Sequence, residues 1–315
     1  MQNKKNLKIV FFGTPEFAVA SLKRLLNDGH DIAAVVTMPD KVAGRGHKLL
    51  QSDVKKCALA HGLPILQPTN LKDAAFTEEL RAIGADLFIV IAFRMLPESV
   101  WAMPPLGTFN LHASLLPRYR GAAPINRAIM NGDTETGITT FFLRHEIDTG
   151  DIIQQCRVDI LPEDNAGTVH DRLMQLGADM VADTVKAISE GTVTTSPQPQ
   201  GEFIPAPKIF KEDCHIDWTR PAHDIHNQIR GLSPYPAAWT EIRNTGGELL
   251  TVKVFESRLT DRHGLKPGEI STEGKSLIVG CGDNSALVIL SLQPAGKRRM
   301  ETEAFLLGYH PEAFV

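Results

Sequence analysis

The sequence predicts an α/β protein with two domains: a first domain built on a mostly parallel sheet, and a smaller second domain that forms a β-barrel or sandwich. Three observations indicate this. The chain has 315 residues, which suits two domains of ordinary size. Short apolar runs alternate with helical periods over roughly the first 190 residues. Beyond Lys211 the pattern changes to short alternating segments separated by turn residues.

The first strand and helix follow from the first 29 residues. The apolar run at 7–13 predicts a strand buried on both faces, as in a parallel sheet. Thr14 is expected to cap the next helix, with Pro15 at its first position and Glu16 near the positive end of its dipole. Gly29 is expected to end that helix.

The same alternation continues to residue 131. Gly62 and Gly84 follow the last turns of two helices, where a left-handed residue is favoured. Because strands alternate with helices, we expect most of the sheet to be parallel. The predicted strands are 31–37, 86–92 and 107–112, and the predicted helices are 52–61, 73–83 and 121–131.

A long amphipathic helix over 168–190 is expected to close the first domain. Thr168 and Asp171 resemble an N-terminal capping signature, and Gly191 follows the last turn. The next stretch is polar, contains prolines and has no regular period, so it is interpreted as a linker. The predicted boundaries are 1–190 for the first domain, 191–210 for the linker and 211–315 for the second domain.

The second domain is expected to begin with one helix and to continue with short strands. The turn segments 244–247 and 282–284 separate these strands. Such spacing is typical of a small barrel or sandwich. The predicted helix is 222–231, and the predicted strands are 238–243, 249–256, 276–279 and 286–292.

Composition gives no sign of a metal or disulfide framework. Hydrophobic residues make up 43 % of the chain, so a large hydrophobic core can form without disulfides or metal ions to stabilise it. The four cysteines, at 57, 156, 214 and 281, are too far apart for a zinc knuckle or a CxxC pair. His223 and His226 have helical spacing, but no third ligand is evident. The sequence therefore predicts no metal site.

We expect a cytoplasmic protein with no membrane attachment. The apolar run near the N-terminus, at 9–12, is too short for a signal peptide or a membrane span, and no later run reaches the length of a transmembrane helix. The net charge of −4 argues weakly against a nucleic-acid partner, which usually requires a basic surplus. A local basic patch could still bind one.

Polar side chains gather where predicted strands end. Asn110 and His112 lie two residues apart on a strand and so share a face, at the edge where parallel sheets bind ligands. Asp148 lies in a turn between the strand-like runs 138–143 and 152–158, near the same edge. An amide, an imidazole and a carboxylate suit acyl transfer to an amine. Asn110 and a protonated His112 can donate to the oxyanion, while Asp148 favours the protonated histidine and relays the proton.

Each of these residues also has a simpler interpretation. His112 alone could be a structural histidine, and Asp148 could only form an Asx-turn. The DTG triplet at 148–150 also occurs in aspartic proteases, but those need a second such carboxylate and an all-β fold. The cationic residues of the loop 39–48 and the basic cluster 297–299 could be solvated surface charges.

Several motifs carry a family resemblance. The stretch NLHASLLPRYRGAAP at 110–124, followed by IDTGD at 147–151, resembles the signature of 10-formyltetrahydrofolate-dependent formyltransferases. FFGTPEFA near the start, MPDKVAGRGHKL at 38–49, HIDW at 215–218 and LSLQPAGKRRM at 290–300 resemble the methionyl-tRNA formyltransferases of that superfamily. The resemblance covers nearly the whole chain.

The resemblance implies a fold, a reaction and partners. The fold would be a Rossmann-like catalytic domain followed by a C-terminal OB-like barrel that positions tRNA. The reaction would transfer a formyl group from the co-substrate 10-formyltetrahydrofolate to the α-amino group of methionyl initiator tRNA, for translation initiation. We expect no metal, and we expect a monomer.

The resemblance also implies roles for individual residues. Ala113 departs from the family, because a glycine is frequent after the catalytic histidine. The segment 93–97 is shorter than expected, and Arg94 could alter the rim of the pterin pocket. Neither departure touches the catalytic residues. The implied residues are Asn110, His112 and Asp148 for catalysis, Ser114, Leu115, Leu116 and Pro117 for folate, and Lys41, Arg45, Lys48, Lys297, Arg298 and Arg299 for tRNA.

Three other functions stay open at this point. A different folate-dependent formyltransferase would act on an amino sugar, a ribonucleotide amine or water; the segment 38–49 and the second domain favour tRNA. A dinucleotide oxidoreductase would need a GxGxxG fingerprint, which residues 13–15 do not provide. An RNA-binding module without catalysis would leave Asn110, His112 and Asp148 unexplained.

Overall fold

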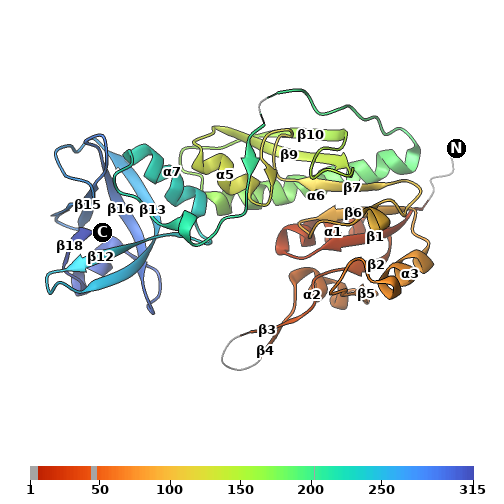
Figure 1. Cartoon of the computed structure of the whole chain (residues 1–315), viewed down its shortest axis with the longest axis horizontal. Helices are drawn as coiled ribbons and strands as arrows, with labels where there is room; N and C mark the ends of the chain where they lie inside the picture. The colour runs from red at the N-terminus through yellow and green to blue at the C-terminus, as the bar shows by residue number, and fades with distance from the viewer. Residues whose placement is uncertain (1–5, 44–47, 202) are drawn as a thin grey trace. The chain divides into compact units, whose positions relative to one another are not determined.

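The computed structural model describes residues 6–43, 48–201 and 203–315. The chain divides into two compact units, each assembled from three segments (Figure 1). Unit 1 comprises Met1–Gly121, Gly137–Val158 and His170–Pro205, and unit 2 comprises Ala122–Thr136, Asp159–Val169 and Ala206–Val315. The predicted domain boundaries at residues 190 and 211 stay a prediction.

Unit 1 is built on a seven-stranded sheet with the order β10-β9-β7-β6-β1-β2-β5. The five strands from β5 to β7 pair in parallel, and β9 pairs antiparallel with β7. The order changes direction at β1, as in Rossmann-like sheets, which confirms the predicted fold class. The strands are β1 (Lys8–Gly13), β2 (Asp31–Val36), β5 (Ile65–Leu66), β6 (Leu87–Ile91), β7 (Thr108–His112), β9 (Glu135–Phe142) and β10 (Ile152–Asp159).

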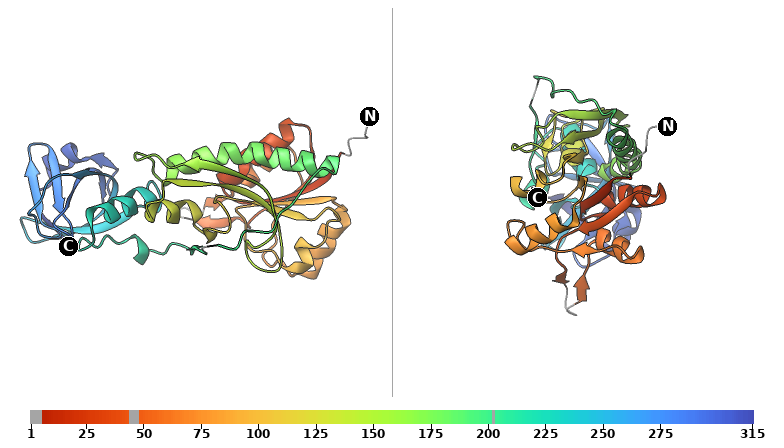
Figure 2. Two further views of the ribbon diagram at one scale, coloured as in Figure 1. Left: turned by 90° about the horizontal axis from the view of Figure 1, so that it is seen from above. Right: turned by 90° about the vertical axis from the view of Figure 1, so that its right-hand side faces the viewer.

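Helices cover both faces of this sheet. Phe12 and Phe88 belong to the same apolar cluster as Phe76 of α3. On the opposite face, Leu111 of β7 meets α6 at Gly177, where a Cβ would lie only 2.7 Å from the Leu111 side chain. Figure 2 shows α6 along the same face as α1. The helices are α1 (Glu16–Asn27), α2 (Asp53–Ala60), α3 (Ala74–Ile83), α4 (Glu98–Trp101) and α6 (Ala166–Glu190).

A hairpin stands where the sequence predicted a loop. β3 (Lys41–Ala43) and β4 (Lys48–Leu50) pair antiparallel, with Lys41 opposite Leu50. Residues 44–47 lie outside the described part of the chain. Two further short strands, β8 (Arg120–Gly121) and β11 (Pro205–Ala206), form a two-stranded sheet.

Unit 2 contains a nearly closed antiparallel sheet, which confirms the predicted small barrel. The strand order is β14-β15-β16-β13-β12-β18, and β17 pairs with β16. Closure depends on Gly268, because a Cβ there would lie 2.4 Å from the carbonyl oxygen of Phe314. The strands are β12 (Ala238–Asn244), β13 (Leu249–Thr260), β14 (Ile270–Glu273), β15 (Ser276–Gly280), β16 (Ala286–Pro294), β17 (Met300–Glu301) and β18 (Pro311–Phe314).

Helices fill and flank this barrel. Ile225, Ile229 and Leu232 of α7 are fully buried in the same cluster as the inward residues of the strands. Phe305 of α8 belongs to that cluster as well. The remaining helical elements are α5 (Pro124–Met130), α7 (Ala222–Leu232), α8 (Thr302–Gly308) and a 3₁₀ turn at Glu212–Cys214.

Two predicted helix caps are wrong. Pro15, not Thr14, precedes the first turn of α1, and no side chain caps that helix. At α6 the cap is Asn165, whose Oδ1 accepts from the N–H of Thr168 at 3.0 Å. Thr168 instead accepts from the N–H of Asn165, so it holds the third position of a capping box. In both helices the residue predicted to cap lies one or more positions away from the residue that holds the cap position.

Candidate active site

β7 carries Asn110 and His112 to the carboxyl edge of the parallel strands. The strand lies between β6 and β9, with Asn110 opposite Val90 and Phe141. His112 is 7 % exposed, whereas Asn110 is half-buried. Leu111 points to the α6 face, so its two neighbours point to the other face. The predicted pairing of these two side chains on one face is therefore present.

The imidazole of His112 has two different environments. Its Nε2 donates to the carbonyl oxygen of Tyr119 at 2.9 Å, and since a carbonyl only accepts, this nitrogen carries a proton. Its Nδ1 lies 3.9 Å from Oδ2 of Asp148. That distance is too long for a hydrogen bond but allows an ion pair with the protonated ring. Nδ1 is thus the nitrogen left for proton transfer.

Asp148 is held in an unusual conformation. Its φ is +54°, in the left-handed region that few residues other than glycine adopt. Its Oδ2 accepts from the N–H of Gly121 at 3.0 Å, and its side chain is only 15 % exposed. The fold therefore brings the predicted His112 and Asp148 together, although they are 36 positions apart in the sequence.

The predicted folate loop is anchored to the sheet. Ser114 is fully buried and its hydroxyl donates to the carbonyl of Arg118 at 2.7 Å. Leu116 is 2 % exposed, while Leu115 and Pro117 are half-buried. Contacts with a ligand would therefore come from Leu115, Pro117 or the backbone, and not from the side chains of Ser114 and Leu116.

Two polar residues that the sequence did not single out hold this loop in place. Thr139 of β9 donates from Oγ1 to the carbonyl of Ser114 at 2.6 Å and accepts from the N–H of Leu116 at 3.3 Å. Gln155 of β10 donates to Thr139 Oγ1 and to the carbonyl of Leu116. Only the strand pairing brings these residues to the loop, so no local motif marks them.

Gln198 is another residue that the sequence did not single out. It lies in the stretch predicted as a linker, yet its Nε2 donates to the carbonyl oxygens of Asp148 at 2.7 Å and Gly150 at 2.9 Å. Its Oε1 accepts from Nε of Arg120 at 3.2 Å and from a terminal nitrogen of the same guanidinium at 2.6 Å. The stretch therefore contacts the turn that carries Asp148.

The predicted tRNA-binding cations fall in two places. Lys41 is exposed at the start of β3, Lys48 lies in β4, and Arg45 lies outside the described residues. In unit 2, Lys297 and Arg298 are exposed in a turn.

Arg299, the third cation of that turn, is engaged within unit 2. It donates to Ser291 and Glu256, and its guanidinium lies 4.7 Å from the ring centroid of Phe255. Arg299 is therefore less available to a partner than its two neighbours.

Arg94 stabilises the loop after β6. Its guanidinium donates to the carbonyl oxygens of Thr69, at 2.8 Å, and Pro68. Burial lowers the pKa of this guanidinium. The departure from the family pattern thus supplies a structural anchor between two loops.

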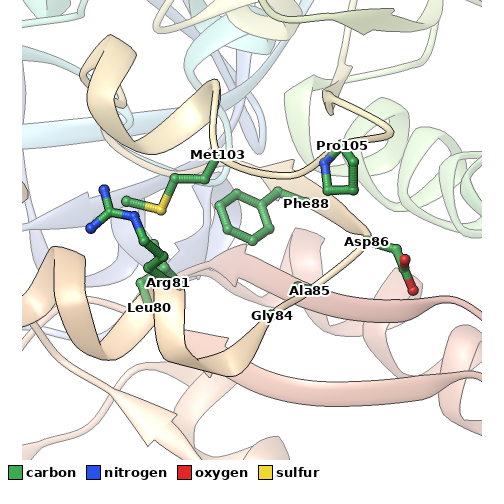
Figure 3. A pocket seen from close by; sticks show the side chains of 8 residues that line it. All are labelled: Leu80, Arg81, Gly84, Ala85, Asp86, Phe88, Met103 and Pro105. Atoms are coloured by element: carbon green, nitrogen blue, oxygen red, sulfur yellow. The ribbon is translucent and has the colours of Figure 1, made fainter.

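A pocket of about 280 Å³ lies away from these residues (Figure 3). It is at the amino end of β6, whereas the predicted site is at the carboxyl ends of the strands. None of the predicted site residues lines it. Its lining residues are Leu80, Arg81, Gly84, Ala85, Asp86, Phe88, Met103 and Pro105.

Within residues 6–43, 48–201 and 203–315, no three histidine, cysteine or acidic side chains form a group that could hold a metal ion. Over the same residues, no helix has the length and apolar character needed to span a membrane.

Comparison with known proteins relates the whole chain to one family. A family model described as formyl transferase matches residues 7–185, and one described as the formyl transferase C-terminal domain matches residues 208–310. A methionyl-tRNA formyltransferase of Bacteroides fragilis is 57 % identical over 317 residues, covering 99 % of this chain and 98 % of the relative. One of Flavobacterium johnsoniae is 50 % identical over 306 residues, covering 96 % of each.

Solved structures share the fold. WlaRD, a sugar 3N-formyl transferase solved in the presence of dTDP and 5-N-formyl-THF, matches with a TM-score of 0.68 at 21 % identity, covering 93 % of this chain and 100 % of that chain. HypX from Aquifex aeolicus in complex with tetrahydrofolic acid matches with a TM-score of 0.65 at 17 % identity, covering 96 % of this chain and 47 % of that one. At such identities the likeness extends to the fold alone.

Proposed function

The chain belongs to the formyl transferase family, and we propose that it transfers a formyl group from 10-formyltetrahydrofolate to the α-amino group of methionyl initiator tRNA. The observation that carries the proposal is the full-length similarity to methionyl-tRNA formyltransferases at 50–57 % identity. This similarity includes the C-terminal region, which we propose positions the tRNA. A formyltransferase that acts on a small amine would not need such a surface. The product, N-formylmethionyl-tRNA, serves translation initiation.

The chemistry needs no covalent enzyme intermediate. The amine nitrogen bonds to the formyl carbon, whose oxygen becomes an oxyanion. The bond from that carbon to N10 of the folate then breaks, and tetrahydrofolate leaves as N10 gains a proton. The amine loses one proton in exchange. The protein therefore has to stabilise one negative oxygen and move one proton.

Asn110, His112 and Asp148 divide these tasks. Asn110 is half-buried, and its side-chain amide makes no hydrogen bond with any described residue, which leaves its N–H groups for the oxyanion. His112 takes and returns the proton through Nδ1, beside the carboxylate of Asp148. The 3.9 Å separation is consistent with a contact that shortens when substrates bind. Leu115 and Pro117 contribute apolar contacts to the folate.

The tRNA is bound by local cations on both parts of the chain. These are Lys41, Arg45 and Lys48 around the hairpin, and Lys297 and Arg298 in the second domain, with Arg299 as a structural support. The two family matches, over residues 7–185 and 208–310, support a catalytic domain at 1–190, a linker at 191–210 and a tRNA-positioning domain at 211–315. We expect the enzyme to act as a monomer in the cytoplasm, where charged tRNA is used.

A mixed-acceptor experiment tests this function. The enzyme is given 10-formyltetrahydrofolate with methionyl initiator tRNA, the same tRNA uncharged, and a nucleotide-linked amino sugar in one reaction. Mass spectrometry then identifies the formylated product. We expect the formyl group on the methionyl amine only. A formylated sugar, or free formate without a formylated acceptor, would refute the proposed substrate.

A further inference from the structure

Gln198 lies beside the catalytic turn without being part of any predicted motif. The turn at 147–151 has to hold Asp148 at a φ of +54°, a conformation that is unfavourable for a residue other than glycine. Such a conformation persists only where the surroundings impose it. The contacts of the turn therefore decide where the Asp148 carboxylate points.

The strand β9 fixes one side of the turn. A Cβ at Gly150 would lie 1.6 Å from the carbonyl oxygen of Phe142, so the turn is packed directly on the backbone at the end of β9. The N–H of Phe142 also donates to the carbonyl of Asp151 at 3.1 Å. These contacts hold Gly150 and Asp151 but do not touch Asp148 itself.

Gln198 fixes the other side. One amide nitrogen donates to both the carbonyl of Asp148 and the carbonyl of Gly150, so it bridges the turn across Thr149. The orientation of this amide is set because its oxygen accepts twice from the guanidinium of Arg120. The neighbouring residue, Gly121, donates its N–H to the Asp148 carboxylate. Hydrogen bonds therefore hold Asp148 at two points: Gln198 binds its backbone carbonyl, and Gly121 binds its carboxylate.

We propose that Gln198 is a positioning residue for the formyl transfer: it holds the backbone of Asp148 so that the carboxylate faces Nδ1 of His112. The inference rests on the proposed function, because the Asp148 carboxylate matters only if it serves the histidine. Gln198 acts through Asp148 and makes its hydrogen bonds to Arg120 and the turn, so it should affect turnover more than substrate binding.

The test is a double-mutant cycle. Gln198→Met keeps the length of the side chain but removes the donor and the acceptor. We expect kcat to fall about 10- to 100-fold, the loss typical of a misplaced catalytic group, with little change in the KM of either substrate. In an Asp148→Asn background the same substitution should change kcat little, because the group it positions is already inactive. Gln200→Met, at an exposed position two residues away, is the matched control and should be silent.

Three results would overturn the proposal: an unchanged kcat in Gln198→Met, a loss of equal size in the Asp148→Asn background, or an equal loss in Gln200→Met. If the wild-type enzyme formylates no tRNA, the proposed function fails by itself. A crystal structure of Gln198→Met then decides the geometric part. We expect Asp148 to leave its positive φ and its carboxylate to separate from the N–H of Gly121. An unmoved turn would contradict the role of Gln198.

Discussion

His112 has one imidazole nitrogen engaged by the protein and one free for chemistry, and this difference determines what its substitution should do. The carbonyl of Tyr119 holds Nε2, so we propose that Nδ1, beside Asp148, is the atom that moves the proton. His112→Ala and Asp148→Asn should each lower kcat by about 10²–10⁴-fold, the usual contribution of a general acid–base group. Steady-state kinetics, with circular dichroism to confirm folding, measure this. Near-normal turnover in either variant would remove that residue from the mechanism.

Asn110 has a different expected effect, because its proposed role is to stabilise charge and not to move a proton. Removing one oxyanion donor typically costs about 10²–10³-fold in kcat. Asn110→Ala should show a loss of that size without a change in the shape of the pH–rate profile, whereas His112→Ala should change the profile. An altered profile in Asn110→Ala would instead place Asn110 in the proton path.

The sequence predicts this site only in part, for a physical reason. Asn110 and His112 follow from strand period, and Asp148 follows from a turn between strands, all of which are local patterns. Gln198, Thr139 and Gln155 reach the site through sheet pairing or an aperiodic segment. No local period encodes such contacts, so these residues could not be found before the fold was known.

At the scale of elements, the base of the β3–β4 hairpin is held by a closed polar network. Lys55 of α2 donates to Asp40 at 2.6 Å and to Gln67 at 2.8 Å, and Gln67 donates to Asp40 at 2.8 Å. The side chains of Lys55 and Asp40 are only 15 % and 18 % exposed. The hydrogen bond from Lys55 holds the pKa of the Asp40 carboxyl below its ordinary value. The network fixes where the hairpin projects from the rest of unit 1.

Loss of this network should affect tRNA use and spare folate use. We expect Lys55→Met to raise the KM for methionyl-tRNA about tenfold, equivalent to about 1.4 kcal/mol, while the KM for 10-formyltetrahydrofolate stays the same. Lys56→Met is the control, because Lys56 is on the same helix and has only an exposed pair with Asp53. Equal increases in both KM values would indicate general loosening of unit 1 and would contradict a role specific to the hairpin.

The hairpin also shows which secondary-structure elements can be predicted from the sequence and which cannot. Its glycines and cations predict an irregular charged loop, and strands of three residues have too little period to be recognised. Longer elements such as β1, β6, α3 and α6 were predicted to within a few residues, because buried runs and helical stripes are long enough to show a period. In unit 2, β14, β18 and α8 were missed for the same reason as the hairpin.

At the scale of the whole molecule, the titration of one histidine in unit 2, His226, should limit the stability of the protein in acid. Burial, and then the charges of Arg230 and His223, lower the pKa of His226 from 6.5 to about 4. The unfolded chain therefore binds this proton more readily than the folded chain does. Stability should be complete above pH 6.5 and should fall as the pH drops toward 4, by at most about 1.4 kcal/mol per pH unit.

Denaturant unfolding across this pH window checks the prediction. His226→Gln keeps a polar partner for Ser257 but does not titrate, so its unfolding free energy should depend less on pH than that of the wild type. His310→Gln, at an exposed position elsewhere in unit 2, should behave like the wild type. Identical pH dependence in His226→Gln and the wild type would contradict the assignment to His226.

The central claim is that this protein transfers the formyl group from the folate to a charged tRNA. The most direct measurement is kcat/KM for methionyl initiator tRNA relative to kcat/KM for a nucleotide-linked amino sugar, with the same 10-formyltetrahydrofolate. We expect a ratio of at least about 10⁴, since a small amine would gain almost none of the binding energy that we propose the local cations supply to tRNA. A ratio near or below one would contradict the claim and make the protein a small-amine formyltransferase.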